Sequence, residues 1–110
     1  MKEIDDCRLN KLYLRDAMDV ISGKWKLVIL HVLEYRPFHF KELTREIGIT
    51  PRMLSKELQE LELHGLVART VLKTKPVRVE YAITEYGKTL HDVSRSIKEW
   101  GKMHRTKSMQ

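Results

Sequence analysis

The chain has 110 residues, of which 42% are hydrophobic and 33% charged, and its formal net charge is +6. This length suggests one domain, and the apolar share excludes a chain that stays disordered. The excess of positive charge favours an anionic partner, with nucleic acid first and a membrane surface second. The longest aliphatic run, Leu27 to Leu30, is far too short to span a bilayer.

The first eight residues are polar and predict a loose arm. They do not resemble a signal peptide, because acids stand where such a peptide needs an apolar region. Cys7 is the only cysteine, so no disulfide can form within the chain, and a reducing cytoplasm is the expected compartment. Apolar residues recur at helical intervals from Leu9 to Ile21 and predict a helix over that range.

A second helix is predicted over residues 24–34, where the chain is apolar almost all round. Ser22 can act as its N-cap, because a serine hydroxyl can accept a hydrogen bond from the first turn. A helix that is apolar on most sides is buried, so we expect this one to form the centre of the core. A buried strand is the alternative, although the run is long for one.

A short helix is predicted next, ending at Ile47. Pro37 ends the preceding helix because it disfavours helical backbone at the residue before it, and residues 38–40 can form a short extended stretch. Gly48 suits the left-handed conformation in which many helices end. The inward-facing residues of this short helix are Phe40, Leu43 and Ile47.

A longer helix begins at once, over residues 51–64. Thr50 suits its N-cap, and Pro51 suits its first position, where a missing N–H costs no hydrogen bond. Gly65 ends it. The apolar residues Leu54, Leu58 and Leu61 have the spacing of one buried helical face.

The pattern then changes to that of two strands, residues 66–72 and 77–83, the second of which alternates cleanly. The basic segment 73–76 predicts a tight hairpin tip between them, and Thr84 suits the N-cap of a last helix. The apolar residues of this helix are spaced by four and three, like a narrow coiled-coil seam. They are Tyr86, Leu90, Val93, Ile97 and Trp100.

This order of elements is that of a winged helix-turn-helix domain, a mainly α fold with a small β-hairpin (α+β). In that motif the second helix enters the DNA major groove with its N-terminal residues on the base edges. A basic hairpin directly after it can act as a wing on the backbone or minor groove. We expect a single domain over 1–110, with the helix-turn-helix at about 40–64, the wing at about 66–83 and the C-terminal helix at about 85–104.

Polar and basic side chains occupy the positions that such a domain turns towards DNA. Arginine and lysine pair with guanine or phosphate, and serine and glutamine can take either role. The N-terminus of helix 51–64 also favours phosphate through its free N–H groups and dipole. The candidates are Arg52, Ser55, Lys56 and Gln59 on this helix, Lys73, Lys75 and Arg78 on or beside the wing, and Lys41, Thr44 and Arg45 on the preceding helix.

Each of these groups also has a plainer interpretation. The polar side of helix 51–64 can be an ordinary solvated face, the wing cations can discourage edge-strand aggregation, and the seam ending at Trp100 can be core. A winged helix can also bind an acidic protein instead of DNA. The co-occurrence of a short helix, a capped turn, a basic first turn and a basic hairpin, in that order, favours DNA.

Three segments, ISGKWKLVIL, RMLSKELQELELHGLV and PVRVEYAITEYG, resemble the HxlR-type winged helix-turn-helix regulators of bacteria. The resemblance covers residues 7–101, and the segments occur in the family's order. It implies a homodimer formed through the N- and C-terminal helices and bound to an inverted-repeat operator in double-stranded DNA.

The resemblance also implicates particular residues. For DNA binding they are Pro51, Arg52, Met53, Ser55 and Lys56, with the N-cap Thr50 beside them, and Lys75 and Arg78 at the wing. For the dimer interface they are Leu9 and Leu12 in the N-terminal helix and Leu90, Val93, Ile97 and Trp100 in the last helix.

The chain departs from the family pattern at the wing and at the N-terminus. Members usually have two prolines before RVEY, whereas this chain has KPV, so the wing tip can differ in shape. Many members carry Cys-Pro nearer to GKW, and in some such a thiol senses oxidants or electrophiles. Here Arg8 follows Cys7 and favours a reactive thiolate, whereas Asp5 and Asp6 oppose it. Cys7 is therefore either a sensor or a small inert side chain.

The sequence predicts neither catalysis nor a metal site. It has no glycine-rich phosphate loop and no identifiable Ser-His-Asp set. The histidines form no HExxH motif, no i, i+4 pair and no Cys/His cluster. They are His31, His39, His64, His91 and His104. We therefore expect no enzyme activity, cofactor or metal, and no membrane partner.

Overall fold

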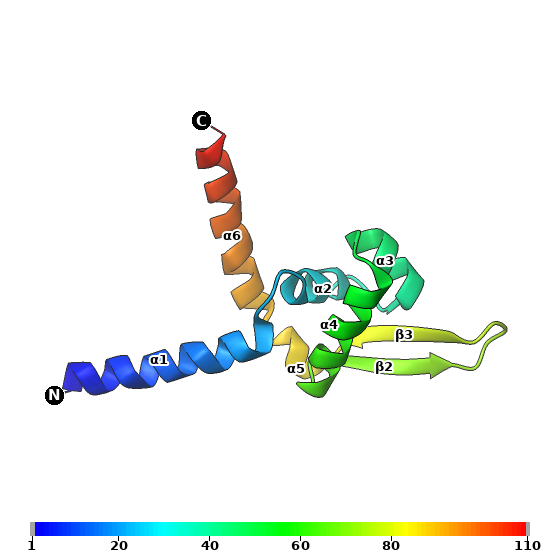
Figure 1. Ribbon diagram of the computed structural model, residues 1–110, viewed down its shortest axis with the longest axis horizontal. Coiled ribbons are helices and arrows are strands. Elements are labelled where there is room, and N and C mark those ends of the chain that lie inside the picture. The colour runs from blue at the N-terminus through cyan, green and yellow to red at the C-terminus, as the bar shows by residue number, and fades with distance from the viewer. Residues whose placement is uncertain (1, 110) are drawn as a thin grey trace.

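The computed structural model describes residues 2–109, which form helices around a small antiparallel sheet. A central body holds the sheet and the helices α2 to α5, and the β2–β3 hairpin projects from it (Figure 1). Helices α1 and α6 leave this body as two diverging arms (Figure 1). The elements are α1 Lys2–Ile21, α2 Lys26–Leu33, β1 Phe38–His39, α3 Phe40–Ile47, α4 Pro51–Leu63, β2 Val67–Leu72, β3 Arg78–Ile83, α5 Glu85–Lys88 and α6 His91–Ser108.

The core lies between the sheet and helices α2, α3 and α4. The strand order is β1-β3-β2, with Tyr81 of β3 paired to Phe38 on one side and Arg69 on the other. Helix α2 is the centre of this core, as its sequence predicts, and the alternative of a buried strand is wrong. The largest fully buried side chains are Ile29, Leu30, Leu33, Leu43, Leu54, Leu58, Leu61 and Leu66.

The turn between α3 and α4 is confirmed in detail. Gly48 has φ = 76°, a left-handed conformation, and its N–H donates to the Thr44 carbonyl at 2.9 Å. The Thr50 hydroxyl accepts a hydrogen bond from the Met53 N–H at 3.2 Å, and Pro51 opens α4. Ile49 between them is buried in the core. Local backbone rules thus fix the change of direction between these helices.

Residues 1–8 are not a loose arm in the described range, because α1 begins at Lys2. No proline or glycine interrupts the chain before Gly23, and Glu3 and Asp5 lie in the first turn of α1, where negative charge is favourable. The predicted start at Leu9 therefore misses the first turns. The polar composition of residues 1–8 does not prevent the described part of this segment from being helical.

Ser22 is not the N-cap of α2. Its N–H donates to the Met18 carbonyl at 2.8 Å, so Ser22 belongs to the end of α1. Gly23, with φ = 99°, then turns the chain. Helix α2 begins at Lys26, and Trp25 before it provides no side-chain cap.

The predicted last helix is two helices. Thr84 caps only the short α5, by accepting a hydrogen bond from the Gly87 N–H at 2.9 Å. The Thr89 N–H bonds back three residues to Tyr86 instead of four, and its hydroxyl donates to the same carbonyl. Such local bonds compete with the α-helical ladder. Gly87 is required here, because an added Cβ would lie 2.2 Å from the Leu66 carbonyl oxygen.

The first half of α6 contacts α2 and the residue that follows it. His91 Nδ1 lies 3.0 Å from a Glu34 carboxylate oxygen, and Lys98 Nζ lies 3.2 Å from His31 Nδ1. Leu90, just before α6, is half-buried against the core. These contacts fix the direction in which the C-terminal arm leaves the body.

Candidate DNA-binding surface

Helix α4 has one buried and one exposed face, and the exposed face carries the predicted reading residues. Its apolar side is buried in the core through Leu54, Leu58 and Leu61. Arg52, Lys56 and Gln59 are exposed, whereas Ser55 is half-buried. At the N-terminus of α4, Thr50, Pro51 and Met53 are also exposed. The capped end of α4 therefore presents cations and free N–H groups on the protein surface.

Helix α3 contributes two exposed cations and one hydroxyl that is already hydrogen-bonded. Lys41 and Arg45 are exposed. Thr44 is half-buried, and its hydroxyl donates to the Lys41 carbonyl at 2.7 Å. Of the three residues predicted on this helix, the two cations are thus the better placed to meet a phosphate.

The start of α3 is held by Glu42. Its carboxylate accepts a hydrogen bond from the His39 N–H at 3.0 Å and another from Arg36 at 3.1 Å. Both bonds lower the pKa of Glu42 below its usual value. The hydrogen bond from the His39 N–H has the largest effect, and the hydrogen bond from Arg36 has the second largest. The ionised carboxylate therefore fixes the first turn of α3 to the loop before it.

The hairpin of β2 and β3 forms a wing with a basic tip. Leu72 pairs with Arg78 at the end of the ladder, and the Thr74 hydroxyl donates to the Pro76 carbonyl at 2.7 Å across the tip. Lys73, Lys75 and Arg78 are all exposed. The wing can therefore present all three cations to a polyanion.

An open groove of about 780 Å³ brings the two α3 cations together with one cation of the wing. Lys41 and Arg45 border it from α3, and Arg78 borders it from β3. Phe40, Val79 and Tyr81 add apolar surface to its lining. The fold thus joins Lys41, Arg45 and Arg78 around one groove, which is lined neither by Lys73 and Lys75 of the wing nor by Arg52 and Lys56 of α4.

A buried ion-pair cluster fixes α4 to α2. Lys26 Nζ donates a hydrogen bond to Glu57 at 2.7 Å and another to Glu60. The Lys26 and Glu57 side chains are 6% and 7% exposed. Burial alone would lower the pKa of Lys26, but its bonds to the two carboxylates outweigh that effect and raise the pKa. The pKa of Glu60 is lowered, chiefly by its hydrogen bond with Lys26.

Sequence reasoning missed this cluster. A signal was present, because Lys26 interrupts an apolar run and Glu57 and Glu60 are one helical turn apart. The partners are separated by 31 and 34 residues along the chain, so only the packing of α2 on α4 brings them together. The cluster lies on the inner side of α4 and fixes the orientation of its exposed face.

The predicted interface residues on the two arms are exposed. Every side chain of α1 from Glu3 to Asp19 is exposed, Leu9 and Leu12 included. On α6, Val93, Ile97 and Trp100 are 43%, 48% and 60% exposed. Cys7 is a free, exposed thiol on α1. Large apolar side chains gathered in exposed positions are typical of interaction surfaces.

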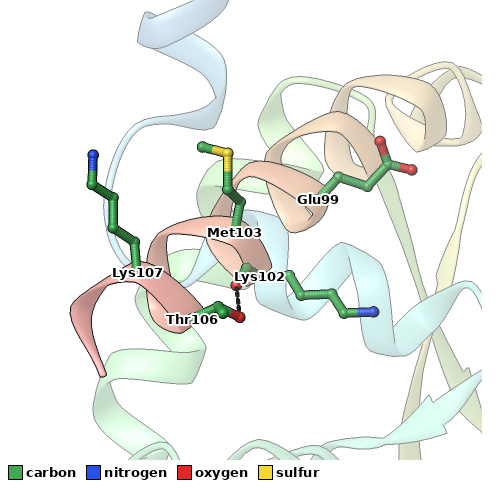
Figure 2. Close-up of a pocket in the computed structure, with 5 residues that line it drawn as sticks. All are labelled: Glu99, Lys102, Met103, Thr106 and Lys107. Atoms are coloured by element: carbon green, nitrogen blue, oxygen red, sulfur yellow. Dashed lines mark hydrogen bonds between the residues drawn. The ribbon is translucent and has the colours of Figure 1, made fainter. Parts of the chain in front are cut away.

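The end of α6 carries a shallow hollow along one side. Figure 2 shows the residues that line it, with the Thr106 hydroxyl bonded to the Lys102 carbonyl at 3.1 Å. All of them belong to α6, so no second element encloses a ligand there. They are Glu99, Lys102, Met103, Thr106 and Lys107.

Over residues 2–109, no three or more His, Cys, Asp or Glu side chains gather as they would to hold a metal ion. In the same range, no helix combines the length and the apolar character needed to cross a membrane.

The family model of the HxlR-like helix-turn-helix matches residues 20–109. This match spans most of the chain, the helix-turn-helix and the wing included. The chain belongs to the HxlR-like helix-turn-helix family. The family and the winged-helix fold predicted from the sequence motifs are therefore confirmed.

Relatives of this HxlR-like chain are transcriptional regulators. It is 45% identical over 87 residues to an uncharacterised HTH-type transcriptional regulator of Halalkalibacterium halodurans, covering 77% of each chain. Among solved structures, it is similar to the putative HTH-type transcriptional regulator ytcD, with a TM-score of 0.80, 37% identity and coverage of 84% and 96% of the two chains.

The oxidised form of the redox regulator HypR has a TM-score of 0.77 to the HxlR-like chain at 40% identity, covering 82% of this chain and 94% of HypR. All of these relatives are regulators, a class that is not typically enzymatic. The HxlR-like chain thus belongs to a family whose named relatives are helix-turn-helix transcriptional regulators.

Proposed function

We propose that this protein binds an inverted-repeat DNA operator as a homodimer, with α4 of each protomer in the major groove of one half-site. One observation carries the proposal. The N-terminus of α4 is capped by Thr50 and exposed, with Arg52 and Lys56 on its open face. Helix-turn-helix proteins read base edges with the residues at this end of the second helix.

Within this arrangement the exposed residues of α4 have separate roles. Arg52 and Lys56 pair with guanine or phosphate, and Ser55 and Gln59 hydrogen-bond to bases or to the backbone. Met53 is exposed and can contact a thymine methyl group. The free N–H groups beside Pro51 receive a phosphate.

The groove between α3 and β3 supplies contacts to the DNA backbone. Lys41, Arg45 and Arg78 border it, and Lys73 and Lys75 lie at the exposed tip of the wing. Such cations position a protein on the duplex and release counterions, without reading sequence. Their number makes binding steeply dependent on salt.

The dimer is formed by the two arms. Leu9 and Leu12 on α1, with Val93, Ile97 and Trp100 on α6, supply exposed apolar surface for a second copy. Leu90, by contrast, packs against the core of its own protomer, so its contribution to the interface is smaller. A two-fold dimer presents two copies of α4, which suits an inverted repeat with half-sites one helical turn apart.

The test is selection of genomic DNA fragments by the purified protein, followed by titration of the selected sequence. We expect an inverted repeat, and Arg52→Ala should weaken operator binding by about 1–3 kcal/mol and relax specificity at one position in each half-site. Glu62→Ala, an exposed change near the other end of α4, is the control. Unchanged binding by Arg52→Ala would refute the assignment of α4. If the selected DNA fragments share no common sequence, the result would favour a winged-helix module that binds an acidic protein.

A second candidate function is thiol sensing through Cys7. Cys7 is exposed on α1, and the chain is similar to the redox regulator HypR. Because the chain has one cysteine, any disulfide it forms between protein thiols joins two chains. Diamide treatment should give a covalent dimer on a non-reducing gel that Cys7→Ser abolishes, together with altered operator binding. If diamide does not change operator binding, Cys7 is not a sensor and is an inert side chain.

A further inference from the structure

Glu60 lies at the boundary between the buried and the exposed side of α4. Its side chain is 42% exposed, whereas that of Glu57 on the inner side is 7% exposed. Lys56 stands four residues before Glu60 and is exposed. Residues four apart are neighbours on the surface of a helix. The Glu60 carboxylate can therefore turn either outwards, to Lys56, or inwards, to the core.

In the structure the Glu60 carboxylate turns inwards. It accepts a hydrogen bond from the ammonium group of Lys26 on α2, which also donates to Glu57 at 2.7 Å. Over the part of the chain that the structure describes, Glu60 forms no other ion pair and Lys56 forms none. A cation from α2 thus holds a carboxylate that would otherwise stand beside Lys56.

We infer that Lys26 is a positioning residue for DNA binding: by holding Glu60 on the inner side of α4, it leaves Lys56 free to contact DNA. This inference rests on the proposed function, in which α4 lies in the major groove. Without Lys26, the Glu60 carboxylate would pair with Lys56 one turn away. A cation that contacts DNA would then be occupied by a carboxylate of its own helix.

The charges around Glu60 explain why Lys26 prevails over Lys56. The pKa of Glu60 is lowered chiefly by its hydrogen bond with Lys26, and the charge of Lys56 adds a smaller contribution. Glu60 is therefore ionised at neutral pH, and Lys56 is near enough to attract it. The Lys26 side chain is only 6% exposed, and attraction between charges is screened less where water is excluded.

A purely structural role for the bond between Lys26 and Glu60 is the alternative. The bond would then only give the buried ammonium a second acceptor and help to fix α2 to α4, as the bond to Glu57 already does. Both explanations predict weaker DNA binding when Lys26 is lost, because unfolded protein does not bind an operator. They differ in the effect of removing the Glu60 charge once Lys26 is absent.

The experiment measures operator affinity in full-length variants that urea unfolding has shown to be folded. Lys26→Met/Glu57→Leu removes the ammonium together with its buried partner, so Glu60 is released and no buried charge is left unpaired. Operator binding should weaken roughly threefold to fivefold, the size of one exposed ion pair. Adding Glu60→Gln should restore the affinity. With Lys26 and Glu57 present, Glu60→Gln should change it by less than about twofold.

Further variants isolate the contact with Lys56. In a chain that also carries Lys56→Ala, Glu60→Gln should restore nothing, because the released carboxylate has no DNA-binding cation to occupy. Glu62→Gln removes another exposed charge from α4 and should have the same small effect with and without Lys26. If Lys26→Met/Glu57→Leu does not fold, Lys26→Gln/Glu57→Gln takes its place, since the two amides can hydrogen-bond to each other.

Two outcomes would overturn the inference. If Glu60→Gln has the same effect with and without Lys26, the bond between Lys26 and Glu60 is structural only. If Glu60→Gln still restores affinity in the presence of Lys56→Ala, Glu60 repels DNA directly and Lys26 does not act through Lys56. Failure of the proposed function gives a different result: Arg52→Ala and Lys56→Ala, each introduced alone, would leave operator binding unchanged.

Discussion

The body and the arms of this molecule are stabilised in different ways. In the body, side chains such as Leu43, Leu54 and Leu61 are fully buried by elements of the same chain. On the arms, Leu12, Ile97 and Trp100 are half-exposed or more. The core of the body is thus complete within one chain, whereas the arms expose apolar side chains that the proposed second copy would cover. In the proposed function, the body binds DNA and the arms form the dimer.

The largest effect is expected inside the body. Lys26→Met should destabilise the fold by about 3–5 kcal/mol, because it leaves the buried Glu57 carboxylate without its partner. Urea unfolding at fixed protein concentration measures this loss, and Lys41→Met, an exposed lysine, is the control. Replacing Glu57 by leucine as well should recover much of the stability, since a buried ion pair can be exchanged for apolar packing. Failure of that rescue would show that Lys26 acts through contacts other than the pair.

The next effect is expected on the arms. Trp100→Ala should weaken the dimer by about 2 kcal/mol, as large aromatic side chains do at the centre of interfaces. Sedimentation equilibrium measures the dissociation constant of the dimer. Leu63→Ala replaces an exposed apolar residue at the end of α4 and should have no effect on that constant. The free energy of unfolding of the body should change little in Trp100→Ala. If Trp100→Ala destabilised the monomer instead, the division between self-sufficient body and dependent arms would be wrong.

A smaller effect is expected at the wing. Lys75→Ala should weaken binding to all DNA sequences uniformly, by less than Arg52→Ala weakens operator binding, and should reduce the slope of log affinity against log salt by about 1. Titrations at several salt concentrations, with the operator and with a random duplex, measure both quantities. A loss confined to the operator would mean that the wing reads sequence.

The smallest effect concerns Glu42 at the start of α3. The pKa of Glu42 is lowered by the His39 N–H and by Arg36, so the carboxylate stabilises the fold above its unfolded pKa. That contribution is lost as the pH falls through the lower folded value. The stability difference between the wild type and Glu42→Gln should therefore be present at pH 7 and shrink below about pH 4.5. A difference that stayed constant down to pH 3 would contradict this role.

Much of the body could be predicted from sequence, because its elements follow local rules. Gly48, Thr50 and Pro51 determine the turn of the helix-turn-helix through backbone preferences alone, and the strands of the wing lie within one residue of their predicted limits. The break between α5 and α6 was not predicted, because no proline marks it: the Thr89 N–H and hydroxyl both bond to the Tyr86 carbonyl and interrupt the helical ladder.

The candidate site divides in the same way. The exposure of Arg52 and Lys56 follows from the helical period of α4, and it could be predicted. The groove that joins Arg45 to Arg78, and the burial of Lys26 under α4, depend on how distant segments pack. Sequence reasoning had no access to that packing.

Helix α2 has a consequence for how such regulators diverge. One side of this eight-residue helix holds α4 through Lys26, and the other holds α6 through His31 and the following Glu34. In the proposed dimer, the distance between half-sites is therefore determined by α2 and the arms, whereas the sequence of each half-site is determined by the exposed residues of α4. The two properties of an operator can then change by separate mutations. A duplicated copy could acquire new target genes through α4 alone and keep its spacing and its mode of dimerisation.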